Sequence, residues 1–202
     1  MIIIDGRQVD FKLSSFDNLQ EVIVKVMEDG LLEERVVTDV LVDNEQFSEI
    51  YPHQAEDIAC KEIKRLEIHS VPTVQMALSI SEELDKVNKL LGNGAKEVAA
   101  LFRQADDSEA LEMFQDMLDV TRDFLGMIAL LRNEYVDLEL SMPEFASNAE
   151  SISSLLSEMT EVLENEDWVL LSDLLEYEFL PAMENWSVVI GKLQSTLASM
   201  QQ

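Results

Sequence analysis

Three acidic side chains near the C-terminus are the first candidates for chemistry in this sequence of 202 residues. The stretch DWVLLSDLLEYEFLPAMENW, from Asp167 to Trp186, carries Asp173, Glu176 and Glu178 in its middle. Two carboxylates serve acid–base catalysis when a shared, water-poor pocket separates their pKa values. At 3.6 residues per turn, these three acids spread around the edge of a helix instead of converging. We therefore expect one wall of a helical bundle, with a functional groove as the alternative.

Other reactive groups are few. The two histidines, His53 and His69, precede the helical part, which therefore lacks the Glu-x-x-His pairs of a di-iron bundle. The single cysteine, Cys60, rules out an intrachain disulfide, and without a nearby base pattern we expect a small buried apolar residue. Calcium-loop, phosphate-loop and Gly-x-Ser-x-Gly patterns are missing. We predict no enzyme, no cofactor and no metal; a carboxylate-based metal-binding protein or enzyme is the alternative.

The charge of the chain limits its partners. Its net charge is −27, from 41 acidic and 14 basic residues. Nucleic acids and anionic membranes are bound chiefly through cationic side chains, so both are excluded as expected partners. A basic protein or an amphipathic helix is the expected partner. A need for solubility or a saline habitat would account for the acidity equally well.

The expected location is the cytoplasm of a bacterium. The first residues, MIIIDGRQ, contain no basic leader and only a short apolar run, unlike a signal peptide. No stretch reaches the roughly 18–20 apolar residues that a membrane span requires.

The first 71 residues alternate in the manner of strands, apart from one helical segment at 15–28. The expected strands are MIIID and VDFKL around a GRQ turn, RVVTDVLVD, FSEIY after a DNEQ turn, and IKRLEIHSV. This order resembles the β-grasp, or ubiquitin-like, fold, in which a mixed sheet wraps one helix. Ubiquitin-like modifiers act through a free C-terminal Gly-Gly, whereas the corresponding place here reads Ser70-Val71-Pro72 and continues. The resemblance therefore implies docking rather than conjugation or sulphur transfer.

From Pro72 onwards the apolar residues repeat with the helical period, and Pro72 itself suits a first helical turn. The expected helices are 73–91, ended by GNG at 92–94, then 95–105, 107–133, one from SMPE at 141–144 to ENED at 164–167, and 167–199. The fold class is thus α+β, with a β-grasp-like domain at 1–71 and a mainly antiparallel helical bundle at 72–202. Gly126 would allow a close helix approach. The bundle resembles the small helical export and flagellar chaperones of bacteria, which implies the holding of a partner polypeptide.

A contact face is expected on the last helix. Trp168 and Trp186 are 18 residues apart, which is five turns, so they should point the same way about 27 Å apart. Pro181 should bend the helix between them. We select Trp168, Tyr177, Glu178 and Trp186 as the partner-binding residues. The predicted function is a non-catalytic protein-binding adaptor or chaperone-like module, compatible with a homodimer; a self-associating structural protein is the alternative.

Overall fold

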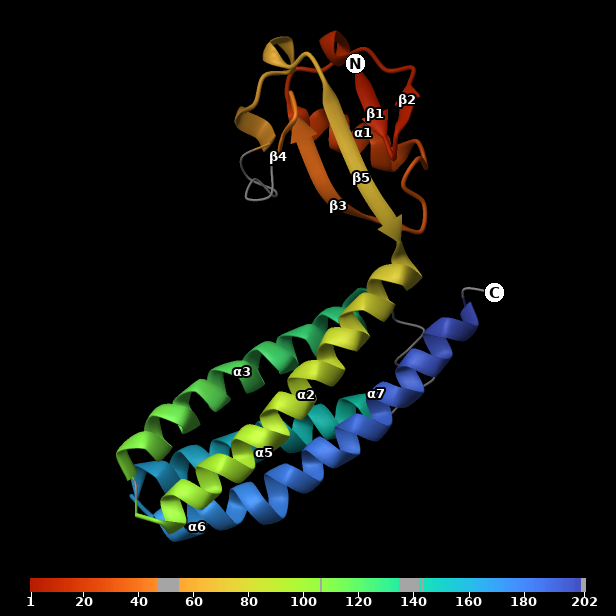
Figure 1. Cartoon of the computed structure of the whole chain (residues 1–202). Helices are drawn as coiled ribbons and strands as arrows, with labels where there is room; N and C mark the ends of the chain where they lie inside the picture. Colours follow the sequence, from red (N-terminus) through yellow and green to blue (C-terminus); the bar gives the residue numbers. More distant parts are fainter. Residues whose placement is uncertain (47–54, 106, 135–141, 143, 201–202) are drawn as a thin grey trace. The chain divides into compact units, whose positions relative to one another are not determined.

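The protein forms two compact units in a computed structural model, Met1–Met76 and Ala77–Gln202. It describes residues 1–46, 55–105, 107–134, 142 and 144–200 (Figure 1). The predicted boundary after residue 71 falls slightly earlier, in the last strand. A five-stranded sheet in the first unit is followed by a mostly helical second unit, so the predicted α+β class is confirmed.

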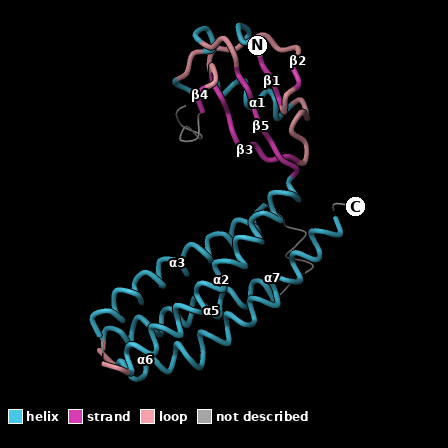
Figure 2. Tube along the Cα trace, in the orientation of Figure 1, coloured by secondary structure: helices cyan, strands magenta, loops and turns pink. Residues whose placement is uncertain are grey.

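The first unit is a mixed sheet with one helix, α1 (Leu19–Glu28). Its strands are β1 (Ile2–Ile4), β2 (Arg7–Val9), β3 (Arg35–Val42), β4 (Glu45–Gln46) and β5 (Leu66–Pro72). The strand order is β2-β1-β5-β3-β4, with β1 and β5 parallel and the other pairs antiparallel (Figure 2). The sheet and α1 share one apolar core. This is the predicted β-grasp-like arrangement.

Each of the two hairpin turns of the sheet has two residues with positive φ, in the left-handed region of backbone conformation. Asp5 and Gly6 join β1 to β2 with φ of 47° and 77°, as a type I′ turn requires. Asp43 and Asn44 join β3 to β4 with φ of 51° and 72°. The predicted DNEQ turn is therefore shorter than expected, because its last two residues already form β4. The predicted strand FSEIY lies outside the described residues.

The helix α1 begins later than predicted. Residues 13–15 form a separate 3-10 turn, and Asn18 caps α1 by accepting a hydrogen bond from the Glu21 N–H at 3.0 Å. The Glu21 carboxylate in turn accepts from the Asp17 N–H at 2.9 Å. These two hydrogen bonds satisfy the N–H groups of Glu21 and Asp17 in the manner of a capping box with Asn18 as the N-cap.

The second unit is a helical bundle. No helix in the described part of the chain is long and apolar enough to cross a membrane. Its elements are α2 (Thr73–Arg103), α3 (Asp107–Glu134), α5 (Glu144–Glu164), α6 (Trp168–Leu174), a π-helical turn η4 (Leu175–Phe179) and α7 (Leu180–Met200). Buried leucines and phenylalanines such as Leu84, Phe114 and Phe179 form the core. Pro72 is not in a first helical turn as predicted, because it ends β5 opposite Arg35.

The predicted break at residues 92–94 is wrong, since α2 runs without interruption through both glycines. Glycine in a helix interior costs about 1 kcal/mol relative to alanine. The apolar residues Leu91, Ala95 and Val98 lie buried around these glycines. Burial of a large side chain contributes about 1.5–3 kcal/mol, so packing outweighs the glycine penalty.

The predicted last helix, 167–199, is helical without a break from Trp168 to Met200, but it contains a π-helical turn that was not predicted. The π-helical turn η4 separates α6 from α7, and the Leu180 N–H donates to the carbonyl of Leu175, five residues earlier. Pro181 follows directly and has no N–H to donate to the Tyr177 carbonyl. The wider turn absorbs one extra residue at this point. The spacing of the two tryptophans is therefore not five regular turns.

The buried stripe of α5 contains Leu155 and Val162, whereas Leu156 and Leu163 are only partly buried. One smaller prediction differs from the structure. A Cβ atom at Gly126 would meet nothing within 4 Å, so no close helix approach occurs there.

Candidate contact surface on the C-terminal helices

The start of α6 fixes the first predicted contact residue, Trp168. The side chain of Asp167 caps the helix by accepting a hydrogen bond from the Leu170 N–H at 3.0 Å. The Trp168 ring stacks on Phe102 of α2, with ring centroids 5.4 Å apart and planes inclined by 6°. Trp168 is therefore half-buried, with part of its surface accessible.

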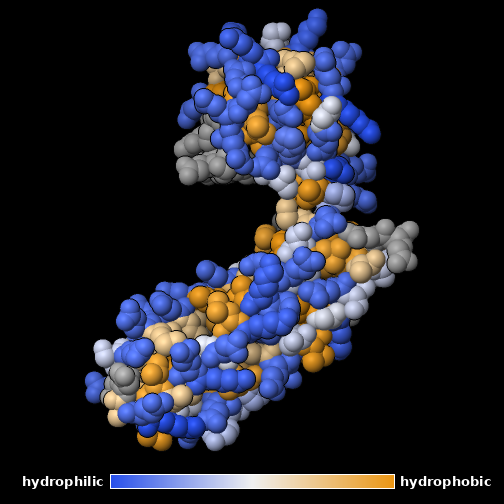
Figure 3. Space-filling view, in the orientation of Figure 1, coloured by the Kyte–Doolittle hydropathy of each residue, from blue (hydrophilic) through white to orange (hydrophobic). Residues whose placement is uncertain are grey.

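Three apolar side chains that follow Trp168 in the sequence lie open to solvent. Val169 is 73% exposed, Tyr177 is 65% exposed and Leu170 is 42% exposed. We call these three residues the α6 patch. Figure 3 shows hydrophobic residues between hydrophilic ones at the α6 end of the bundle. A valine exposed to this degree contributes little to stability through burial.

Acidic groups surround the α6 patch, and one arginine organises two of them. Arg103 of α2 donates to the Asp173 carboxylate at 2.9 Å and also pairs with Glu176. These hydrogen bonds, with a further one to Tyr177, raise the pKa of the Arg103 guanidinium. Asp173 and Glu176 therefore do not spread apart as predicted, because both turn towards Arg103.

The arrangement does not supply the chemistry of a catalytic carboxylate pair. Asp173 is 47% exposed and Arg103 is 44% exposed, so water reaches the cluster. The third acid, Glu178, is exposed and belongs to no ion pair among the described residues. The guanidinium is shared by Asp173 of α6 and Glu176 of η4, which suits a structural tie between α2 and these two elements.

Trp186 contradicts its predicted role. Its ring is 0% exposed and makes edge-to-face contacts with Phe124 and Phe145, at centroid distances of 5.4 and 5.2 Å. A fully enclosed ring cannot contact a partner, so the prediction for Trp186 is wrong. The π-helical turn, invisible in the apolar pattern, places the two tryptophans in different surroundings.

The remaining reactive residues have structural surroundings. Cys60 is 1% exposed, which confirms the predicted buried apolar residue, and burial raises the pKa of its thiol. The His69 imidazole lies 3.5 Å from the Glu67 carboxylate on the same strand, while His53 lies outside the described residues. No group of three or more histidine, cysteine, aspartate or glutamate side chains within the described ranges could hold a metal ion.

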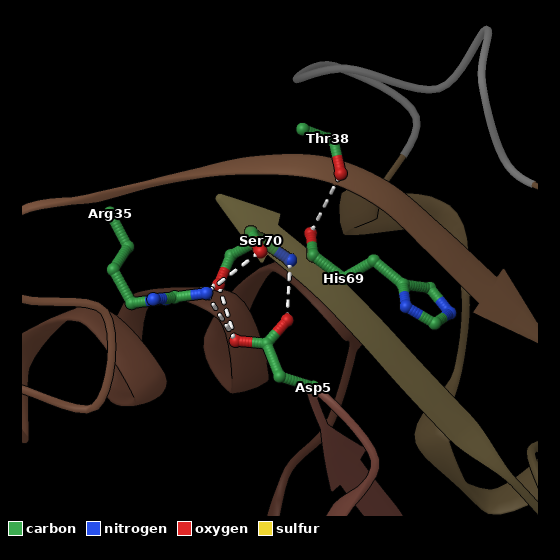
Figure 4. Close-up of polar contacts among 5 residues, drawn as sticks. All are labelled: Asp5, Arg35, Thr38, His69 and Ser70. Carbon is green, nitrogen blue, oxygen red and sulfur yellow. Dashed lines mark hydrogen bonds and ion pairs between the residues drawn. The ribbon is translucent and has the colours of Figure 1, made fainter. Parts of the chain in front are cut away.

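A polar cluster in the first unit was not predicted from the sequence (Figure 4). The Asp5 carboxylate accepts hydrogen bonds from the Ser70 N–H and from the Ser70 hydroxyl, each at 2.7 Å. The Arg35 guanidinium lies 3.0 Å from Asp5 and also donates to the Ser70 carbonyl at 2.9 Å. Burial raises the pKa of Asp5, but the Ser70 hydrogen bonds and Arg35 outweigh it, so the pKa lies below its ordinary value. The cluster ties the first turn to β5 and β3.

Comparison with known proteins adds the family. Residues 79–189, more than half of the chain, match the model described as domain of unknown function DUF8042. The chain belongs to the DUF8042 family. Residues 1–71 match the model of a second domain of unknown function, DUF8043. No curated protein and no solved structure matches the chain. The DUF8042 match runs from α2 into α7 and therefore includes the whole α6 patch.

Proposed function

We propose that this DUF8042 protein is a non-catalytic protein-binding module of the bacterial cytoplasm, adaptor-like or chaperone-like in action. The exposure of the α6 patch carries the proposal. Its three apolar side chains are open to solvent on a unit that otherwise encloses large rings such as Trp186 and Phe179. An apolar surface with a polar rim is typical of a protein interaction site.

The rim of the α6 patch determines what kind of partner it suits. The exposed acids Glu166, Asp167 and Glu178 lie on the same segment of chain, and residues 133–202 contain Lys192 as their single basic residue. A partner polypeptide with apolar side chains flanked by lysine or arginine matches both features. An amphipathic helix with a basic border is the simplest such partner.

The experiment compares capture by matched surface variants. Affinity-tagged full-length protein is used to retain partners from native lysate, and the retained polypeptides are identified by mass spectrometry. The double variant Val169→Ser, Tyr177→Ser removes the patch, whereas Val188→Ser changes a 60% exposed valine elsewhere on α7. We expect the wild type and Val188→Ser to retain the same polypeptide and the double variant to lose it.

Two outcomes would contradict the proposal. Retention of the same polypeptide by the double variant would place the interface elsewhere. Retention of a second copy of the chain alone, with a dimer in sedimentation, would favour the self-associating structural protein instead.

A further inference from the structure

Two irregular segments of the bundle lie opposite each other. One is the run Gly-Asn-Gly at 92–94 in the middle of α2, and the other is the π-helical turn η4. On one side of them the Asn88 side-chain N–H donates to the Met183 carbonyl, and on the other side the Ser172 hydroxyl donates to the Ala99 carbonyl, both at 3.0 Å. The antiparallel register of these two hydrogen bonds places residues 92–94 opposite η4. We call the two segments together the irregular level of the bundle.

Nothing in the packing requires glycine at this place in α2. A Cβ atom at Gly92 or at Gly94 would meet nothing within 4 Å, although glycine is the least favourable residue after proline in a helix interior. Gly126 and Gly191 are equally free of neighbours, so this freedom alone does not indicate a function. Gly92 and Gly94 differ from them because they lie two positions apart and face a second irregular segment. Their backbone freedom allows α2 to bend here.

The facing segment also departs from regular α-helical hydrogen bonding. In η4 the Leu180 N–H donates to the Leu175 carbonyl, five residues earlier. Pro181 has no N–H, so the Tyr177 carbonyl lacks its usual helical donor four residues later. Sharp bends of helices occur at prolines and at π-helical turns, and this segment contains both.

The two other long helices of the bundle are able to follow a bend. In α3 the buried Thr121 hydroxyl donates to the Met117 carbonyl at 2.7 Å, and hydrogen bonds of this kind often bend helices. Thr121 lies between Phe114, whose ring contacts the end of α2, and Phe124, whose ring contacts α7. In α5 the Ser153 hydroxyl donates in the same way to the carbonyl four residues earlier.

Contacts on the α6 side of the irregular level hold the end of α2 and α6 together. Besides the buried hydrogen bond from Ser172, the Trp168 ring stacks on Phe102 with centroids 5.4 Å apart. Arg103 also pairs with Asp173 at 2.9 Å. These contacts join the two segments into one body. We call it the end body, and it comprises residues 95–103 and 168–174.

Contacts on the other side of the irregular level hold α2 against α7. The Gln194 amide donates to the Ser81 carbonyl at 3.2 Å, and the hydrogen bond from Asn88 to Met183 lies nearest to the irregular level. Each contact named here lies entirely on one side of that level. A bend there therefore breaks none of them, and the change is confined to residues 92–94 and η4.

We propose that the bundle is hinged at the irregular level and that the end body moves there as one unit. Val169 and Leu170 of the α6 patch belong to the end body, whereas Tyr177 belongs to η4 itself. The motion therefore changes the position of two side chains of the α6 patch relative to the third. A partner that contacts all three fixes the hinge in one position. This last consequence rests on the proposed function, whereas the motion does not.

The test is relaxation-dispersion nuclear magnetic resonance of the full chain without any partner. Hinge motions take microseconds to milliseconds, which is the range that this method detects. We expect the amides of residues 90–97 and 175–183 to report one common exchange rate, as a concerted motion requires. The minor state should be populated between about 0.1 and 10%. The amides of α1, in the first unit, should show no exchange at this rate.

Matched alanine variants assign the motion to the irregular level. The double variant Gly92→Ala, Gly94→Ala removes the freedom of the hinge in α2. The double variant Gly126→Ala, Gly191→Ala makes the same chemical change in α3 and α7, at positions equally free of neighbours. We expect the first variant to lower the population of the minor state about 4- to 30-fold, the effect of two such changes, and the second to leave it unaltered.

Three results would overturn the hinge. Absence of exchange, or unrelated rates in the two segments, would show that they do not move together. An unaltered population in the Gly92→Ala, Gly94→Ala variant would place the motion elsewhere. An equal fall in both double variants would show a general loosening of the bundle. None of these results affects capture by the α6 patch, and a failed capture leaves the relaxation result standing.

Discussion

Asp5 combines two roles in one residue. Its backbone adopts the left-handed conformation of the first turn, and its carboxylate binds Ser70 and Arg35. Asp-Gly and Asn-Gly are both preferred in type I′ turns. Replacement by asparagine therefore keeps the turn and removes the charge alone.

For Asp5→Asn we expect a loss of about 1 kcal/mol in unfolding free energy at neutral pH, the difference between charged and neutral hydrogen bonds. The folded-state pKa of Asp5 is lowered, so its contribution is complete above the unfolded pKa and is lost as the pH falls through the folded pKa. The difference between wild type and variant should shrink below about pH 4. Urea unfolding at several pH values measures it, with exposed Asp10→Asn as control. A difference in unfolding free energy that is independent of pH would contradict a stabilising role for the Asp5 charge.

Trp186 is expected to contribute to stability and not to binding. Replacement of an enclosed tryptophan by alanine costs about 3–5 kcal/mol. The Trp186 Nε1 atom is buried without a partner among the described residues, so Trp186→Phe removes an unsatisfied donor and should cost less than half as much. Chemical unfolding followed by circular dichroism gives both values. If Trp186→Ala lost less unfolding free energy than Val188→Ala, the enclosure of the Trp186 ring would be contradicted.

At the level of elements, the sequence indicated the strand period in the first unit and the helical period in the second. It did not indicate where each element begins, ends or changes its helical type. Alternation and helical spacing correctly predicted a sheet with one helix followed by a helical bundle, because burial imposes these periods. They did not predict β4 or the start of β2, which lie where the sequence indicated turns. The continuity of α2 across Gly92 and Gly94 could not be predicted, because packing of distant segments outweighs local propensity.

The candidate site shows the same limit. Of the four residues selected for partner binding, Trp168, Tyr177 and Glu178 have accessible surface, whereas Trp186 is enclosed, and binding by the first three stays a prediction. The π-helical turn depends on Pro181 and on tertiary packing together, and a regular helical wheel contains no sign of it. The partners of Arg103 and the environment of Asn88 come from a different helix, which composition and spacing do not reveal.

The continuity of α2 can be tested through its glycines. Gly92→Ala and Gly94→Ala should each stabilise the protein by about 0.4–1 kcal/mol, because alanine loses less backbone freedom on folding and meets no neighbour within 4 Å. Urea unfolding of both single variants and of the double variant measures the gain. Destabilisation by either alanine would indicate a non-helical conformation at that residue.

At the scale of the whole molecule, the net charge of −27 opposes folding by repulsion between carboxylates. Sodium chloride shortens the screening length from about 10 Å at 0.1 M to about 3 Å at 1 M. We expect the unfolding free energy to rise over this range. The measurement is urea unfolding at increasing salt, repeated at mildly acidic pH, where the rise should be smaller. A fall with salt would mean that surface ion pairs such as Lys86 with Glu83 outweigh the repulsion.

The same charge should act in partner binding. A partner with basic side chains is attracted by the acidic rim of the α6 patch, so its capture should weaken as salt increases, while the protein itself becomes more stable. The opposite directions of these two salt effects separate loss of binding from loss of fold.

Photo-crosslinking in native cells would show what covers the α6 patch. A benzophenone amino acid is placed at position 177 of the full chain and, as control, at position 188, since both side chains are at least 60% exposed. We predict a covalent adduct with a distinct polypeptide from position 177 and none from position 188. No adduct at position 177, identical adducts from both positions, or an adduct made only of two copies of this chain would contradict the proposed binding function.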